Sequence, residues 1–324
     1  MRLLPTIGGS EENRLEVIIL FISLYDSASG MESLRAYVEV CKPRVMALLV
    51  FSGLASGLTA LRMGLGVLNP LGLGPGFSLI LSTLALILVV SGANAITCYI
   101  DRDIDAVMER TRRRPIPSGR IDPPVKALYY GMALSILGLI PLLILSLPAF
   151  LWALFGLFDS AVVYNLLTKR RTVWNIVLGS PAGGAPSMVC WSAVTGQPFH
   201  PVPLLLAALI VLWTPSHIWS LAIRYSDDYR RAGVPMLPSR LGFRSATRCI
   251  ASTTILLPVL STILGVVGRF HIGFYIIVHS LNLVMILLSL NLLLRPSPEN
   301  AYRLFKFTSP YLAVMLTVTA LSAH

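Results

Sequence analysis

Residues 78–98 read SLILSTLALILVVSGANAITC, a run without a single charged side chain. A membrane-spanning helix needs about 20 predominantly apolar residues, whereas a membrane strand needs only about ten that alternate in character. Because this run is long and continuously apolar, it predicts a transmembrane helix, in which backbone groups are hydrogen-bonded within the segment. Eight further stretches have the same character and run over roughly 45–61, 127–145, 149–167, 173–195, 202–222, 249–268, 272–294 and 307–323. The sequence therefore predicts an all-α polytopic membrane protein with nine transmembrane helices.

The composition agrees with this class. Of 324 residues, 55% are hydrophobic and only 13% are charged, which is about half the charged share of a soluble domain. A soluble globular protein and a disordered chain are therefore excluded. The net charge of +11 does not indicate nucleic-acid binding, since an oily chain holds its Lys and Arg on one side of a membrane. The four cysteines have no CxxC spacing, so we interpret them as small hydrophobic residues.

The basic residues of the loops alternate from one side of the predicted membrane to the other. The segment before the first span and the loops after spans two, four, six and eight are rich in Arg and Lys, whereas the opposite loops contain only Arg62 and Arg269. By the positive-inside rule, this pattern predicts a cell-membrane protein with its N-terminus in the cytoplasm and its C-terminus outside.

The first 34 residues differ from the rest of the chain. The apolar run from Leu15 to Tyr25 is too short to span a bilayer and lacks the basic start of a signal peptide. We therefore predict that residues 1–34 form an interfacial or disordered extension, with Met31 as an alternative start, and that residues 35–324 form the membrane domain.

Acidic residues gather in the loop after the second span. Asp101 and Asp105 are four residues apart, so they lie one above the other on a helix, and Thr97 and Asn94 share that face. Like charges at this spacing destabilise a helix unless a cation offsets them. Since Mg²⁺ prefers carboxylate oxygens, the spacing predicts a magnesium site.

A second acidic pair, Asp227 and Asp228, follows the sixth span on the same predicted membrane face. The recurrence of an acidic loop after four further spans suggests two pseudo-repeated four-helix units plus a ninth helix. Arg and Lys interleave with both acidic groups, which favours a diphosphate bridged to the protein by Mg²⁺. The simpler alternative is a solvated, positively charged loop with scattered acids.

Several motifs together resemble one family. They are Lys42-Pro-Arg-Val-Met46, Asp101-Arg-Asp-Ile-Asp-Ala-Val-Met108, Lys169-Arg-Arg-Thr172, Pro181-Ala-Gly-Gly-Ala-Pro186, His217-Ile-Trp219 and Ala232-Gly-Val-Pro-Met-Leu-Pro238. Over about residues 35–324 the sequence resembles the UbiA superfamily of intramembrane prenyltransferases, and within it the protohaem IX farnesyltransferases. The resemblance implies nine helices around a central cavity that is capped by the two acidic loops. It also implies a Mg²⁺-dependent enzyme of the lipid bilayer.

The implied reaction joins farnesyl diphosphate to haem B. The farnesyl group moves to a haem vinyl group, water adds, and haem O results. The resemblance further suggests contact with a downstream haem A synthase or a terminal oxidase assembly, and it gives no role to nucleic acid.

The same resemblance assigns roles to individual residues. Asp101, Asp105 and Asp228 are the expected catalytic acids, and Asp227 joins them as a Mg²⁺ ligand. Thr97 stands where the family has Asn, so Thr97 and the nearby Asn94 are both candidate ligands. The diphosphate is expected to contact Lys169, Arg170, Arg110 and Arg114. His217 and Trp219 are expected to contact the acceptor.

Alternatives remain open at this point. A related prenyltransferase would use an aromatic acid, a quinone precursor or a polar lipid as acceptor. A secondary transporter would also carry acidic residues and a broken helix, but its acids usually lie near mid-bilayer. The fifth predicted span contains two prolines among glycines, which favours a cavity wall over simple helix packing: Gly179, Pro181, Gly183, Gly184 and Pro186.

Overall fold

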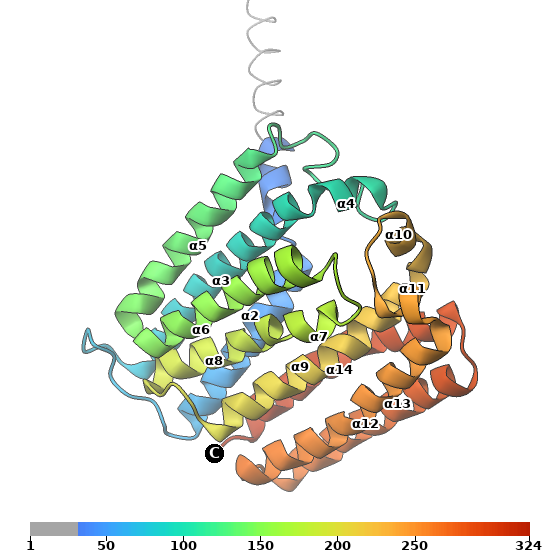
Figure 1. Cartoon of the computed structure of the whole chain (residues 1–324). Coiled ribbons are helices and arrows are strands. Elements are labelled where there is room, and N and C mark those ends of the chain that lie inside the picture. The colour runs from blue at the N-terminus through green and yellow to red at the C-terminus, as the bar shows by residue number, and fades with distance from the viewer. Residues whose placement is uncertain (1–31) are drawn as a thin grey trace, which may run out of the picture.

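The computed structural model describes residues 32–324 (Figure 1). The predicted extension, residues 1–34, therefore lies outside the described part of the chain except for its last three residues. These belong to a helix over residues 32–40 that leads into the membrane domain.

Within residues 32–324, eight helices are long and apolar enough to cross a membrane. They are α2 (Pro43–Arg62), α3 (Pro75–Ile100), α5 (Val125–Leu145), α6 (Leu147–Phe158) continued by the π-helix η1 (Asp159–Thr168), α9 (Pro201–Arg224), α12 (Phe243–Val267), α13 (Ile272–Leu294) and α14 (Pro298–Ser322). No strand occurs between residues 32 and 324. The all-α, multi-pass membrane class is thus confirmed.

The count of nine spanning helices is not reproduced in the described residues. The predicted span 173–195 is divided into α7 (Asn175–Gly179) and α8 (Pro181–Thr195), neither of which is long enough to cross alone. The break has a local cause, because Pro181 has no N–H to continue the hydrogen-bond ladder of α7. The carboxylate of Asp159 accepts a hydrogen bond from the backbone N–H of Ala182 at 2.9 Å, which stabilises the new N-terminus of α8. The pseudo-repeat of two four-helix units stays a prediction.

At each end of the helical domain, a contact joins two residues that are distant in sequence. Glu39 pairs with Arg120 at 2.7 Å, beside the first acidic loop. At the other end, Arg62 donates a hydrogen bond to the backbone oxygen of Ala323. Figure 1 accordingly shows the C-terminus at the end of the bundle opposite α4 and α10. The described part of the membrane domain therefore begins and finishes at opposite ends of the bundle.

Helices α3 and α5 pack side by side through glycines (Figure 1). A Cβ added to Gly131 would lie 2.8 Å from the backbone oxygen of Gly92 and 2.9 Å from the side chain of Ile96. Small residues let the backbones of membrane helices approach this closely.

We expect Gly131→Ala to lower the free energy of unfolding in detergent by about 1–3 kcal/mol, because the new methyl group forces the two helices apart. A fall in the thermal midpoint of the purified protein measures it. The matched control is Gly76→Ala, where a Cβ would meet no atom within 4 Å. Equal midpoints for the two variants would contradict the close-packing explanation.

Candidate active site

The first acidic loop begins where α3 ends. Asp101 is the junction between α3 and the short helix α4 (Arg102–Val107), and Asp105 lies within α4. Both residues are almost fully buried, at 3% and 4% exposure. Asp101 forms an ion pair with Lys169, and both carboxylate oxygens of Asp105 accept from Arg114, at 2.7 and 2.9 Å. Each predicted catalytic acid of this loop therefore faces a predicted diphosphate-binding cation.

One oxygen of this cluster has no partner. Oδ2 of Asp101 accepts from Lys169, but the buried Oδ1 makes no hydrogen bond within the described chain. A buried carboxylate oxygen without a donor is costly. An oxygen of this kind is a good ligand for a hard cation such as Mg²⁺, so the donor chemistry fits the predicted metal. In the side-chain arrangement of residues 32–324, however, no three acidic, histidine or cysteine side chains converge into a ligand set.

Lys169 follows directly after the π-helix η1 and contacts Asp101. The backbone N–H of Lys169 donates a hydrogen bond to the backbone oxygen of Tyr164, five residues earlier, at 2.8 Å. This wider turn rotates the end of the helix relative to a continued α-helix, and such turns are frequent at functional sites. The Lys169 ammonium also lies 5.5 Å from the centre of the Tyr164 ring.

Arg170, the neighbour of Lys169, takes a different partner. It forms a two-pronged ion pair with the carboxylate of Asp103, at 2.6 Å for both bonds. These hydrogen bonds lower the pKa of Asp103 to about 2. Asp103 is not among the predicted site residues; it is two residues from each buried acid, and its side chain is 60% exposed. Asp103 and Arg170 are 67 residues apart, so their pairing could not be predicted from the sequence alone.

The second acidic loop is joined to the first by Asp228. This residue lies in α10 (Ser226–Arg231), just before α11 (Leu237–Leu241). Its carboxylate accepts hydrogen bonds from the backbone N–H groups of Glu109 and Arg110, both at 3.3 Å, and from Arg231 at 2.5 Å. Burial raises the pKa of Asp228, but these three donors outweigh it and bring the pKa below its ordinary value. The two loops therefore meet, as their shared membrane face predicted.

Asp227 has very different surroundings. Its side chain is 81% exposed and is 3.5 Å from Arg230. Together with Asp228 and Arg110 it borders an open hollow of about 460 Å³ between the two loops. Tyr225 borders the same hollow, and the centre of its ring lies 5.6 Å from the guanidinium carbon of Arg110.

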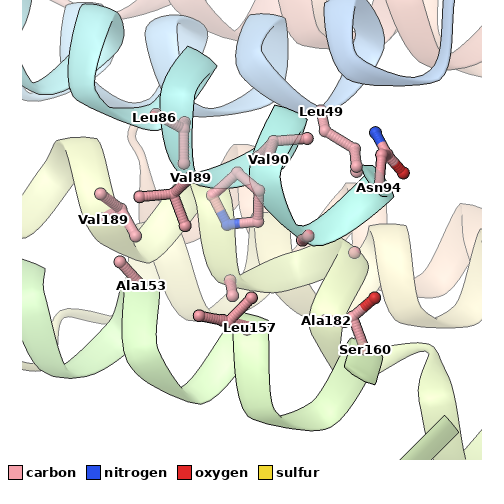
Figure 2. Close-up of a pocket in the computed structure, with 15 residues that line it drawn as sticks. Leu49, Leu86, Val89, Val90, Asn94, Ala153, Leu157, Ser160, Ala182 and Val189 are labelled. Carbon is pink, nitrogen blue, oxygen red and sulfur yellow. The ribbon is translucent and has the colours of Figure 1, made fainter. Parts of the chain in front are cut away.

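Thr97 and Asn94 precede Asp101 on α3, and the side chains of both make hydrogen bonds within the protein. The hydroxyl of Thr97 accepts from Lys42 at 3.2 Å and donates to the backbone oxygen of Asn94 at 2.9 Å. The amide of Asn94 donates to the oxygen of Cys41 at 2.9 Å. Asn94 also borders a narrow apolar cavity of about 90 Å³. Figure 2 shows its walls, Leu86 and Val90 from α3, Leu157 from α6 and Val189 from α8.

A wider cavity of about 480 Å³ lies among α2, η1, α7, α8, α9 and α14. Gly179, Ser180 and Gly183 line it, so the broken fifth span does form a cavity wall. His217 lines the same space. Trp219 is buried at 1% exposure and is not part of this lining.

Residues 45–310 match the UbiA prenyltransferase family. The chain belongs to this family. A UbiA-family relative from Desulforudis audaxviator (strain MP104C), named protoheme IX farnesyltransferase, is 42% identical over 284 residues, covering 88% of this chain and 87% of the relative.

Solved structures agree on the UbiA fold. A digeranylgeranylglyceryl phosphate synthase structure has a TM-score of 0.72 at 19% identity, covering 90% of this chain and 98% of that one. The structure of a UbiA homologue from Archaeoglobus fulgidus bound to GPP and Mg²⁺ has a TM-score of 0.61 at 16% identity, covering 88% and 99%. At these identities the likeness concerns the fold alone.

Proposed function

We propose that this chain transfers the farnesyl group of farnesyl diphosphate to a vinyl group of haem B, with addition of water, and so forms haem O. The observation that carries this function is the 42% identity, over most of both chains, to a protoheme IX farnesyltransferase. The geometry supports it, since charged groups cluster at the ends of α3 and α9 and an apolar cavity lies among the helices beneath them.

The metal of this reaction is proposed to be Mg²⁺, as in the Archaeoglobus fulgidus homologue bound to GPP and Mg²⁺. Asp101, Asp105 and Asp228 are the carboxylates that would hold it, with Asp227 at the rim; Thr97 and Asn94 remain predicted ligands. When bound, Mg²⁺ supplies positive charge that draws electron density from the diphosphate oxygens.

The basic residues of the site are proposed to bind the diphosphate itself. Lys169 and Arg114 already lie against buried carboxylates, and a diphosphate offers these cations further anionic oxygens. Arg110 and Arg170 extend the positive charge outward over the two loops. Negative charge develops on the diphosphate as the carbon–oxygen bond breaks, so fixed cations stabilise that state more than the ground state.

The apolar cavity is proposed to determine whether the farnesyl cation reacts with water or with the haem. Its walls limit early capture by water, so a haem vinyl carbon attacks the farnesyl carbon that carried the diphosphate. The positive charge then lies on the vinyl carbon beside the porphyrin, water adds there, and a proton is released. Farnesyl diphosphate, haem B and water thus yield haem O and diphosphate.

The membrane orientation follows from charge. We propose that the acidic loops lie on the cytoplasmic side with the N-terminus, because the loops at this end of the bundle carry nearly all of the Arg and Lys. The predicted contact with a haem A synthase or terminal oxidase assembly remains part of this proposal.

Purified protein incubated with haem B, farnesyl diphosphate and Mg²⁺ should form a product whose mass equals haem B plus a farnesyl group plus one hydroxyl. In ¹⁸O-labelled water the hydroxyl oxygen should carry the label, since water captures the second cation. Chelation of the metal should stop diphosphate release. An unlabelled hydroxyl would reject the mechanism. Prenylation of 4-hydroxybenzoate without any farnesylation of haem would reject the acceptor.

A further inference from the structure

His217 is held rigidly inside the wide cavity. It lies on α9, two helical turns before the helix ends at Arg224. Its imidazole ring lies between the rings of Trp213 and Phe305, each with a centroid distance of 4.5 Å and with interplanar angles of 17° and 31°. The two aromatic neighbours fix the plane of the imidazole.

Hydrogen bonds also fix which ring nitrogen carries the proton. The hydroxyl of Thr308 lies 2.6 Å from the backbone oxygen of Phe305. A carbonyl oxygen can only accept, so the single hydroxyl hydrogen of Thr308 is used there. The 2.6 Å contact between Thr308 Oγ1 and His217 Nδ1 must therefore be an Nδ1–H donating to the hydroxyl oxygen.

The other nitrogen, Nε2, is consequently a lone-pair donor. Within residues 32–324 it makes no hydrogen bond, and the residues that line its cavity include no acid that could balance an imidazolium. A charged ring in such an apolar space would be costly, so the neutral tautomer with a free Nε2 is favoured. A lone pair of this kind needs a Lewis acid or a hydrogen-bond donor from the substrate.

We propose that Nε2 of His217 is an axial ligand to the iron of the haem substrate and so anchors the acceptor in this cavity; the inference rests on the proposed function. Histidines that bind metals typically donate their other ring N–H to a fixed oxygen acceptor, which sets the tautomer and orients the ring. Thr308 supplies that acceptor here. The ligand bond would fix the distance between the porphyrin and the diphosphate site while leaving the vinyl groups at the ring edge free to react.

Ferric haem titrated into the purified protein in nanodiscs, without farnesyl diphosphate, tests the assignment. The wild type should show the absorption and electron paramagnetic resonance spectra of histidine-ligated haem. His217→Ala should lose them, and added imidazole should restore them by filling the vacated space. The matched control is His279→Ala, because His279 is an intramembrane histidine of α13 that does not line the cavity. Wild-type spectra from His217→Ala, or equal changes in both variants, would overturn the proposal.

Thr308 gives an independent test if His217→Ala folds poorly. Thr308→Val keeps the shape but removes the acceptor of Nδ1–H, so haem affinity should fall about 10–100-fold. Thr308→Ser keeps the hydroxyl and should bind close to the wild type. Equal affinity of Thr308→Val and wild type would contradict the tautomer argument.

A parallel mass assay distinguishes a failure of the ligand assignment from a failure of the proposed function. Farnesylated haem from a wild type whose spectra do not depend on His217 would overturn the ligand assignment and leave the proposed function intact. A wild type that never farnesylates haem would reject the function and the assignment with it.

Discussion

Replacing Asp101 with asparagine should lower kcat by about 10²–10³-fold, the loss expected when one charge-stabilising group is removed from a catalytic site. The substitution keeps the shape of the side chain but removes its charge. Asp101 is 3% exposed, binds Lys169 through one oxygen and leaves the other oxygen free for a metal. Asparagine leaves Lys169 without its anion and offers a weaker ligand. Steady-state kinetics with farnesyl diphosphate and haem measure the effect.

The matched control is Asp122→Asn, since Asp122 is an exposed acid of the same loop. We expect its kcat to stay within about two-fold of the wild type, because exposed charges contribute little. Near-normal turnover of Asp101→Asn in excess Mg²⁺ would contradict the role of Asp101, provided that the variant accumulates in membranes as the wild type does.

Hydropathy predicted the spanning helices well because each one must be apolar along its whole length. The predicted range 272–294 coincides with α13, and 127–145 differs from α5 by two residues at one end. Hydropathy could not predict the break between α7 and α8. Pro181 interrupts the backbone without changing the apolar character of the segment, so the fifth stretch still had the composition of a spanning helix.

The site was predictable where it depended on helical spacing. Asp101 and Asp105 lie four residues apart, and both are buried at the junction of α3 and α4. The sequence could not show which cation each acid meets, because its apolar pattern does not reveal the wider turn of η1 that directly precedes Lys169. The pairing of Arg170 with the exposed Asp103 has the same origin.

The adjacent residues Asp227 and Asp228 show this limit most clearly. The sequence predicts both as Mg²⁺ ligands, with Asp228 also a catalytic acid. In the fold, Asp228 is 5% exposed and accepts two backbone N–H groups from the first loop, whereas the Asp227 side chain is 81% exposed. Successive residues of a helix point in different directions, so only one of the pair can face the other loop.

Asp228→Ala should therefore reduce kcat/KM for farnesyl diphosphate by about 100-fold or more, a loss of the size seen when one preorganised polar group of a catalytic site is removed. The variant loses the carboxylate that joins the two loops and leaves the N–H groups of Glu109 and Arg110 without their acceptor. Asp227→Ala removes an exposed ion pair and should cost less than about five-fold. Faster proteolysis of residues 108–124 in Asp228→Ala alone would show that the first loop has been released. Equal kinetic losses in the two variants, with equal proteolysis, would contradict the joining role of Asp228 and favour two equivalent ligands.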